Sequence, residues 1–470
     1  MSIDIYFDED FIKRFDIFCH NLLLRPFHNL ETIRDTFEKV LTNGNQTLMA
    51  NKFFFQITLF NFFNYKDKGD YLAYLKTINE DLLFFNKTII HYIDIFYSLP
   101  IEKREPLVLH WCNQFSAYES LVQKHIAAAE LVDAAEIKLL KPDNKHPYLS
   151  NNFFMCLKKF NSVFPNLYHD NNYGGGFYFR IDGKGIVVDP GYSFYKQLKS
   201  NNIGIDDIDF IFVSHAHDDH CMDLELIASL LFKYNKLLEL DHSIHVFSSS
   251  NVFNKYSYLN NLNNLFMYAL EPNMSSSSFL GIPNFPSLPF DFLVLKSNHN
   301  EQPYQGLGKD SSLGFIFTLS LPGKTVKFLY TGDTSASELD FSQFIYKFDY
   351  AIMNIGTIEN SVFDIHKNHL GLNGIKRILD TLAFNSRLPR FLLISEFGAE
   401  MVNLRIDISL LLQEYVDDLA KSLTSYSTKV VPCEQNLLID LDSHNIITKN
   451  KHIPLNMATF TMQKMEVVYS

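Results

Sequence analysis

Residues 208–220 read IDFIFVSHAHDDH, an apolar segment whose last six residues hold three histidines and two aspartates. The apolar half, rich in aromatic and β-branched residues, predicts a buried strand. A loop that directly follows a buried strand is a common place for active residues. His215 and His217 can converge on one cation from a tight turn, and Asp219 and His220 can serve a second cation.

The residue types in this cluster indicate a metal and call for further ligands. Imidazole nitrogen and carboxylate oxygen suit Zn²⁺, with Mn²⁺ or Fe²⁺ as alternatives. Two cations need more donors than one cluster offers. Three candidates lie at the ends of predicted elements: His299 after FDFLVLKSN, Asp333 after TVKFLYTG and His369 before LNGIKRILD. The alternatives are surface or capping roles for these three residues and a solvated polar loop for the cluster.

The chain changes character along its length of 470 residues, which suggests two or three domains. Apolar residues at spacings of three and four predict an all-helical domain over 1–145. Its segment 53–63 is apolar nearly all round, which predicts a buried central helix or, alternatively, a docking face for a partner. Alternating strand and helix patterns predict an α/β layered domain over 146–450. Residues 451–470 are expected to form a C-terminal tail.

Composition limits the classes of function. The net charge of −12 makes the chain a poor candidate for long, sequence-blind contact with nucleic acid, although it leaves room for a local basic groove. Its five cysteines are scattered without a CxxC pair, which is typical of a reducing compartment. The acidic N-terminus does not resemble a signal peptide, and the apolar stretch 48–63 is too short and polar to span a bilayer. We therefore expect a cytoplasmic protein without a membrane segment.

The segment 271–290, EPNMSSSSFLGIPNFPSLPF, is rich in serine and proline and predicts a long irregular loop. Such loops are often lids or binding loops. A surface excursion without function is the equally weighted alternative.

Five motifs in one order resemble the metallo-β-lactamase fold superfamily of hydrolases over about residues 147–445. They are GGGFYFRIDGKGIVVDPG at 174–191, HAHDDH at 215–220, the isolated His299, LYTGDT at 329–334 and NHLGLNG at 368–374. The resemblance implies an αββα sandwich with metals at one edge. It implies that His215, His217 and His299 hold a first metal, that Asp219, His220 and His369 hold a second, and that Asp333 bridges both. Asp189 would support the metal loop, or alternatively form a simple turn before Pro190.

Two cations can hold a hydroxide between them, because metal binding lowers the pKa of water to about 7. Hydrolysis is therefore the expected reaction. The candidate catalytic residues are Asp219, whose carboxylate balances metal charge, His366 as a general acid, and Glu396 at a strand end. His366 has an exposed loop position as its alternative. Glu396 would contact a ligand histidine or substrate, or cap the next helix. Cys221 is expected to be a buried structural thiol.

The preferred reaction is phosphodiester hydrolysis by a phosphodiesterase or nuclease acting on a nucleic acid or nucleotide. LYTGDT and the full ligand set resemble those branches most. Asn354 departs from the histidine that serves as proton donor in transfer-RNA 3′-processing nucleases, which weakens that assignment. A lactonase or other carbonyl-ester hydrolase is the first alternative, and a scaffold with an inactive metal site is the second. The N-terminal helices are expected to gate, dimerise or recruit a protein partner.

Overall fold

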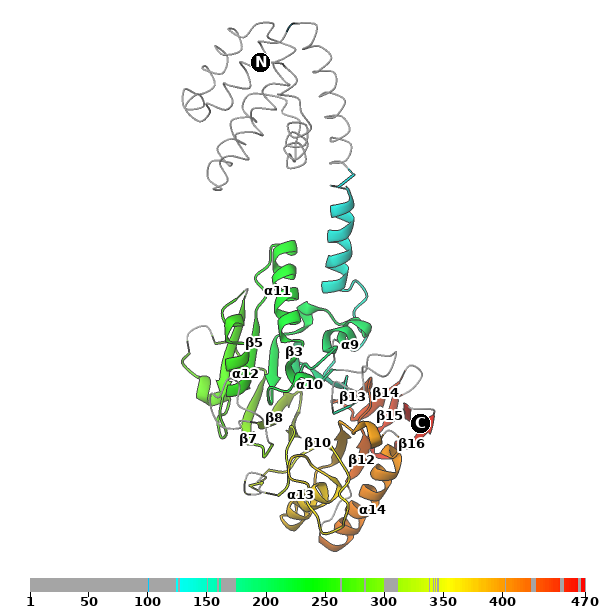
Figure 1. Cartoon of the computed structure of the whole chain (residues 1–470). Helices are drawn as coiled ribbons and strands as arrows, with labels where there is room; N and C mark the ends of the chain where they lie inside the picture. Colours follow the sequence, from blue (N-terminus) through cyan, green and yellow to red (C-terminus); the bar gives the residue numbers. More distant parts are fainter. Residues whose placement is uncertain are drawn as a thin grey trace. The chain divides into compact units, whose positions relative to one another are not determined.

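The chain divides into two compact units, Met1–Ala134 and Ala135–Ser470. The computed structural model describes residues 100, 124–125 and 127–469 (Figure 1), except 150, 159, 162–174, 263, 283–284, 300–311, 338, 341, 343, 345, 402, 424–427, 449–451 and 464–465. Residues 127–140 are helical. The other helices expected over 1–145, the apolar segment 53–63 and the proposed partner surface lie outside the described residues.

Two sheets make up most of the second unit. The larger sheet has the strand order β15-β14-β13-β1-β2-β3-β4-β5-β6, and the smaller has the order β12-β11-β10-β9-β8-β7. The larger contains β1 (Phe153–Cys156), β2 (Phe177–Ile181), β3 (Lys184–Val188), β4 (Phe210–Val213), β5 (Ile244–Ser249), β6 (Leu265–Leu270), β13 (Leu437–Asp440), β14 (Asn445–Ile447) and β15 (His452–Pro454). The smaller contains β7 (Phe290–Lys296), β8 (Leu313–Leu321), β9 (Lys324–Tyr330), β10 (Tyr350–Asn354), β11 (Phe391–Ser395) and β12 (Lys429–Pro432).

Helices cover the outer face of each sheet. They are α9 (Phe194–Ser200), α11 (Leu224–Leu238), α12 (Ser250–Lys255), α13 (Leu372–Phe384) and α14 (Arg405–Leu423). The short helix α10 (Asp218–Cys221) follows the loop after β4. Figure 1 shows α9 and α11 beside the larger sheet and α13 and α14 beside the smaller one. Ile227 of α11 packs in one cluster with Ile211 and Val213 of β4, and Ile375 of α13 packs in another with Leu392 of β11.

The inner faces of the two sheets meet in a core rich in phenylalanine. Alternate strand residues point to opposite faces, so Phe210 and Phe212 enter this core while Ile211 faces the helices. The rings of Phe212 and of Phe317, which belongs to the other sheet, pack in an edge-to-face arrangement with centroids 4.9 Å apart. Each buried ring of this kind stabilises the fold by about 1.5–3 kcal/mol. The predicted αββα sandwich is therefore confirmed.

Parallel pairing brings loops together at one edge of the sandwich. Strand β3 pairs in parallel with β4, and β10 pairs in parallel with both β9 and β11. The carboxyl ends of parallel strands lie at the same edge of a sheet. The predicted turn between β2 and β3 also forms, with Asp182 and Gly183 both at positive φ.

The segment 271–290 packs against the sandwich in its described part. Its 3₁₀ turn η4 (Ser276–Phe279) places Phe279 in the inter-sheet core, and Phe285 packs beside it. Residues after 451, expected to be a tail, also contribute structure: β15 extends the larger sheet, and Ile453 is buried. A hairpin of β16 (Phe460–Gln463) and β17 (Glu466–Tyr469) follows. None of the helices in the described portion is long and apolar enough to cross a membrane.

Candidate metal centre

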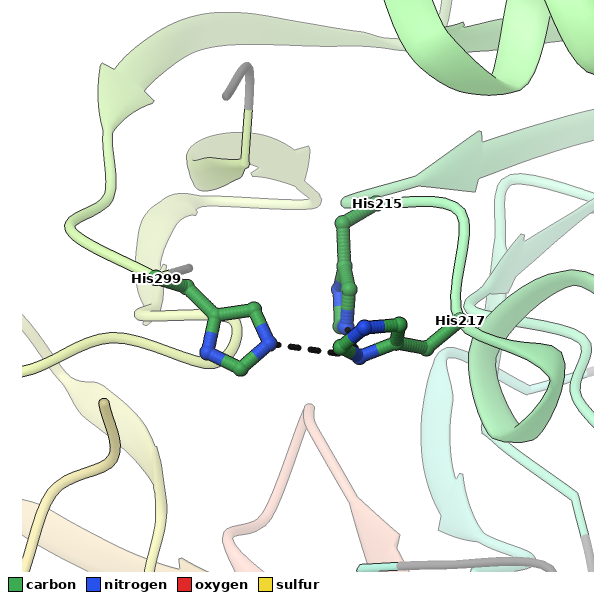
Figure 2. A group of neighbouring side chains, drawn as sticks. All are labelled: His215, His217 and His299. Carbon is green, nitrogen blue, oxygen red and sulfur yellow. Dashed lines mark hydrogen bonds between the residues drawn. The ribbon is translucent and has the colours of Figure 1, made fainter. Parts of the chain in front are cut away.

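Three imidazoles converge at the edge where β4 and β7 end. Figure 2 shows His215, His217 and His299 facing one another. His217 Nδ1 lies 3.0 Å from His215 Nε2 and 3.2 Å from His299 Nε2. His299 is held from behind, because its Nδ1 lies 2.8 Å from the backbone oxygen of Asn368. Three ring nitrogens that point toward one common position form a donor set that suits Zn²⁺.

The carboxylate of Asp333, in the loop after β9, lies between this cluster and the other candidate ligands. Its Oδ2 is 3.9 Å from His215 Nε2, 3.6 Å from His220 Nε2 and 3.5 Å from His369 Nδ1. Burial alone would raise the pKa of Asp333, but the imidazoles of His220, His215 and His369 hold it well below its usual range. The side chain is therefore an anion that faces ring nitrogens on several sides.

Asp219 and His220 lie on the short helix α10. His220 Nε2 is 3.3 Å from Asp219 Oδ2 and 3.5 Å from Glu396 Oε2, so these three donors form one group. His369, which the resemblance assigns to the same metal as Asp219 and His220, is instead grouped with His299 and Asp333. Glu396 thus lies among the candidate ligands, and its buried side chain follows β11 at a positive φ. Burial raises the pKa of Glu396 to about 8.

Asp189 is fully buried beneath the metal loop. It accepts hydrogen bonds from the backbone N–H and hydroxyl of Ser214, each at 2.7 Å, and from Tyr330 OH at 2.5 Å. Its Oδ2 also lies 2.8 Å from His220 Nδ1. A carboxylate can only accept, so this contact assigns the Nδ1 proton to His220 and turns the Nε2 lone pair toward the other ligands. Gly191 lets the chain after Asp189 lie directly against the backbone of Asp219, because a Cβ at this position would lie 1.8 Å from the Asp219 carbonyl oxygen.

The imidazoles of the first cluster are suited to bind a cation at neutral pH. Burial, followed by the nearby ring of His220, lowers the pKa of His215 well below its usual range. Burial and the nearby ring of His299 lower the pKa of His217 in the same direction. Neutral imidazole is the form that ligates metal. The donor chemistry of His215, His217, His299 and Asp333 therefore fits a divalent cation.

Asn354, at the end of β10, contacts the candidate ligands through its amide. Its Nδ2 donates to Asp333 Oδ1 at 3.0 Å and to Tyr330 OH at 3.2 Å. An amide at this position orients the Asp333 carboxylate but supplies no proton to a leaving group. Its contact with Asp333 could not be read from the sequence, where only its difference from a histidine was visible.

His366 contacts the loop that carries His369, whereas Cys221 is buried outside the donor groups. His366 Nδ1 accepts the backbone N–H groups of His369 at 3.1 Å and Asn368 at 3.3 Å, so its ring shapes the loop that carries His369. The rings of His366 and His369 stack with centroids 6.0 Å apart. Cys221 is buried, donates to the backbone oxygen of His217 at 3.2 Å and belongs to none of the described donor groups. Burial raises the pKa of its thiol to about 11.

Lys158, two residues after β1, enters the site without having been predicted. Its side chain is 2% exposed, and its Nζ lies 3.1 Å from Glu396 Oε2 and 3.2 Å from His220 Nε2. The only signal in the sequence is a lysine at the end of the apolar segment FFMCLKKF, and a lysine at a strand end is ordinarily a surface residue.

Comparison with known proteins finds similarity over the residues of this edge. A family model described as the beta-lactamase superfamily domain matches residues 184–390. A protein named Ribonuclease Z from Chlamydia pneumoniae is 36% identical over 87 residues, which are 18% of this chain and 27% of the relative. Ribonuclease Z of Protochlamydia amoebophila is 34% identical over 87 residues, with the same shares. The chain thus matches about a quarter of the length of these relatives.

Three solved structures are similar to this chain at low identity and with TM-scores below 0.5. The metallo-beta-lactamase fold protein YhfI from Bacillus subtilis is 14% identical, with a TM-score of 0.43 over 61% of this chain and 98% of its own. The short form of human tRNase Z is 15% identical, with a TM-score of 0.40 and the same coverage. Yeast PDE1 is 12% identical, with a TM-score of 0.42 over 60% of this chain and 98% of its own. Likenesses at this level carry no information about activity.

The family match covers strands β3 to β10 and helix α13, and it includes every candidate ligand from His215 to His369. Residues 184–390 of this chain thus match the beta-lactamase superfamily domain, in agreement with the resemblance that the sequence motifs indicated.

Proposed function

We propose that the chain is a metal-dependent hydrolase that cleaves phosphodiester bonds in a nucleic acid or nucleotide. The observation that carries this proposal is the convergence of His215, His217 and His299 beside the Asp333 carboxylate. Zn²⁺ is the proposed metal, with Mn²⁺ and Fe²⁺ as alternatives, because imidazole and carboxylate donors suit all three. A bound divalent cation would supply an activated water at neutral pH and stabilise charge on the electrophile.

The named relatives support the choice of phosphodiesters over other substrates. Both relatives compared above carry the name Ribonuclease Z, although the match spans about a quarter of their length. The net charge of −12 favours a small or locally held substrate over a long nucleic acid.

The residues around the ligands have distinct proposed tasks. Asp189 orients His220 and the loop after β4, because it binds His220 Nδ1 and Ser214 together. His366 is the proposed proton donor to the leaving group. Its Nδ1 accepts backbone N–H groups, which leaves Nε2 as the ring nitrogen that carries the proton.

The scheme taken from the resemblance has a second cation on Asp219, His220 and His369, with Asp333 shared. Asp333 Oδ2 lies within 3.9 Å of ring nitrogens on both sides, which supports a shared role for this carboxylate. Lys158 contacts Asp219 and His220, which are two of the residues that this scheme assigns to the second cation.

The cytoplasm remains the proposed location of the protein. The described cysteines Cys156, Cys221 and Cys433 are free thiols and buried, as is usual in a reducing compartment.

Turnover of two substrate classes tests the proposal. The zinc-loaded full chain is assayed with bis-p-nitrophenyl phosphate and, in parallel, with a homoserine lactone. We expect hydrolysis of the phosphodiester, abolished by a chelator and restored by zinc. Turnover of the lactone alone would establish the carbonyl-ester alternative. His217→Ala and Asp219→Ala are the matched variants: if both leave metal content and biological activity unchanged, the chain is a scaffold.

A further inference from the structure

The buried ammonium of Lys158 lies inside a group of metal-type donors. Its Nζ is 2.9 Å from the Asp219 carbonyl oxygen, 3.4 Å from Asp219 Oδ2 and 3.2 Å from His220 Nε2. It is also 3.1 Å from Glu396 Oε2. Asp219, His220 and Glu396 are the three residues of one of the described donor groups that could hold a metal ion. The space that these donors share is thus lined by a positively charged group of the chain itself.

The lone pair of His220 Nε2 decides which cation can be bound there. The contact between His220 Nδ1 and Asp189 at 2.8 Å assigns the ring proton to Nδ1. In the neutral ring, which is the form that ligates metal, Nε2 is the acceptor, and the ammonium of Lys158, which only donates, faces it at 3.2 Å. A metal ion bound by His220 would need the same lone pair, at a distance of about 2.0–2.1 Å. Lys158 and a metal ion therefore compete for one ligand atom.

Lys158 is held in place by contacts on more than one side. Its side chain is buried, with Nζ 3.1 Å from Oε2 of the fully buried Glu396 and 3.4 Å from Asp219 Oδ2. An ammonium that is removed from water needs acceptors of this kind, because a buried charge without partners is costly. The ammonium is therefore a fixed part of the site.

We propose that Lys158 takes the place of the second metal ion of the superfamily scheme, so that the centre holds one divalent cation. That cation is bound by His215, His217 and His299, with Asp333 beside them, and the ammonium of Lys158 remains on Asp219, His220 and Glu396. Lys158 is a positioning residue in this arrangement, because it fixes Asp219 and His220 through contacts and supplies positive charge without exchanging with solution.

The stoichiometry of bound zinc tests this inference independently of turnover. The full chain is stripped with a chelator, reloaded with excess Zn²⁺, freed of unbound metal and analysed for zinc per chain. We expect one zinc ion in the wild type. Lys158→Met keeps the length of the side chain and removes the charge, so we expect two zinc ions. The control Lys184→Met removes an exposed lysine that pairs with Asp209 and should leave the value at one.

Two results would overturn the inference: two zinc ions in the wild type, or one zinc ion in a Lys158→Met variant with a native circular dichroism spectrum. If that variant does not fold, titration of the wild type with Co²⁺ decides, because saturation at one equivalent supports the inference and saturation at two overturns it. Two zinc ions together with phosphodiester turnover would refute this inference and leave the proposed function intact. One zinc ion without phosphodiester turnover would support this inference and refute the proposed function.

Discussion

At the scale of single residues, His366 offers a test that separates proton donation from loop structure. Its Nδ1 accepts two backbone N–H groups, one of them from the candidate ligand His369. In His366→Asn the amide oxygen can replace Nδ1 as acceptor, but the proton on Nε2 is lost. We expect this variant to retain zinc and to hydrolyse phosphodiesters about a hundredfold more slowly, the usual contribution of a general acid.

His366→Gln is the matched variant, because its amide reaches the position of Nε2 and leaves the two backbone N–H groups unpaired. We expect lower zinc content in this variant, because the loop whose Asn368 backbone oxygen holds the ligand His299 loses its support. Unchanged turnover in His366→Asn would rule out the proton-donor role.

Asp189 lies behind the ligands and should act through them. Asp189→Asn replaces an oxygen that accepts from the Ser214 hydroxyl with a group that can donate, so Ser214, whose Oγ lies 3.0 Å from His215 Nδ1, loses its fixed orientation. We expect the affinity for zinc to fall about 10–100-fold while the fold is retained. Calorimetric titration measures the affinity. Asp182→Asn is the control, since Asp182 is exposed and also has a positive φ. Equal affinities in the two variants would contradict the supporting role of Asp189.

The candidate metal ligands could be proposed from the sequence, whereas their partners could not. HAHDDH, His299 and Asp333 were visible because each follows an apolar strand, and strand ends in parallel sheets meet at one edge. The grouping of His369 with His299 depends on how the loop before α13 folds, which periodicity does not encode. Lys158 was missed because a lysine near a strand end ordinarily lies in solvent, and only its buried contacts with Asp219 and Glu396 give it a role.

At the scale of elements, His444 ties the two sheets together at the edge where β9 and β10 begin. Its Nε2 accepts from Lys324 Nζ at 3.1 Å, and its Nδ1 lies 2.6 Å from Tyr350 OH. The contact with Lys324 requires a neutral ring that is protonated on Nδ1, and that Nδ1–H can then donate to Tyr350 OH. Burial and, after it, the positive charge of Lys324 lower the pKa of His444 to about 4.

This lowered pKa predicts a pH dependence of the free energy of unfolding. The unfolded chain binds a proton at His444 below about pH 6.5, whereas the folded chain does so only below about pH 4. Stability is therefore lost as the pH falls from about 6.5 to about 4, by about 1–2 kcal/mol after allowance for partial exposure. His444→Asn tolerates the positive φ of this position and should remove that loss.

Urea unfolding at a series of pH values measures this effect as the difference between the wild type and His444→Asn. His452→Asn serves as a control, because His452 is exposed on β15. A wild type and His444→Asn variant with parallel pH profiles would show that His444 does not titrate as its surroundings require.

Element positions followed from sequence patterns where local residues determine them. The helical pattern of 372–383 matches α13, and the apolar alternation of β2 and β3 with a turn at Asp182 and Gly183 matches the observed hairpin. Strand β15 lies in the segment 451–470, for which a tail was expected, and its three residues pair with β14. Tertiary contacts, and not local propensity, determine such short edge strands.

At the scale of the whole molecule, the candidate centre and its packing lie in one of the two compact units. The described core clusters draw on residues between Leu140 and Ala458, and every candidate ligand lies within that range. A chain that begins at residue 127 should therefore unfold cooperatively and bind as much zinc as the full chain. Differential scanning calorimetry and metal analysis check this, and aggregation or loss of zinc in the shortened chain would contradict it.

The oligomeric mass of the same two chains addresses the proposed partner role of the N-terminal helices. A smaller assembly formed by the shortened chain would support dimerisation through residues before 127. Equal subunit numbers and equal turnover would remove the grounds for a gating or dimerising role.

The central claim is that the cluster around His217 drives metal-dependent phosphodiester hydrolysis. The most direct measurement is the rate of bis-p-nitrophenyl phosphate hydrolysis by the zinc-loaded wild type, the chelated wild type and zinc-treated His217→Ala, each with a homoserine lactone in parallel. We predict phosphodiester turnover in the loaded wild type and its loss, by a factor of about a hundred or more, in the other two samples. Turnover of the lactone alone, or phosphodiester turnover that persists without metal and without His217, would contradict the claim.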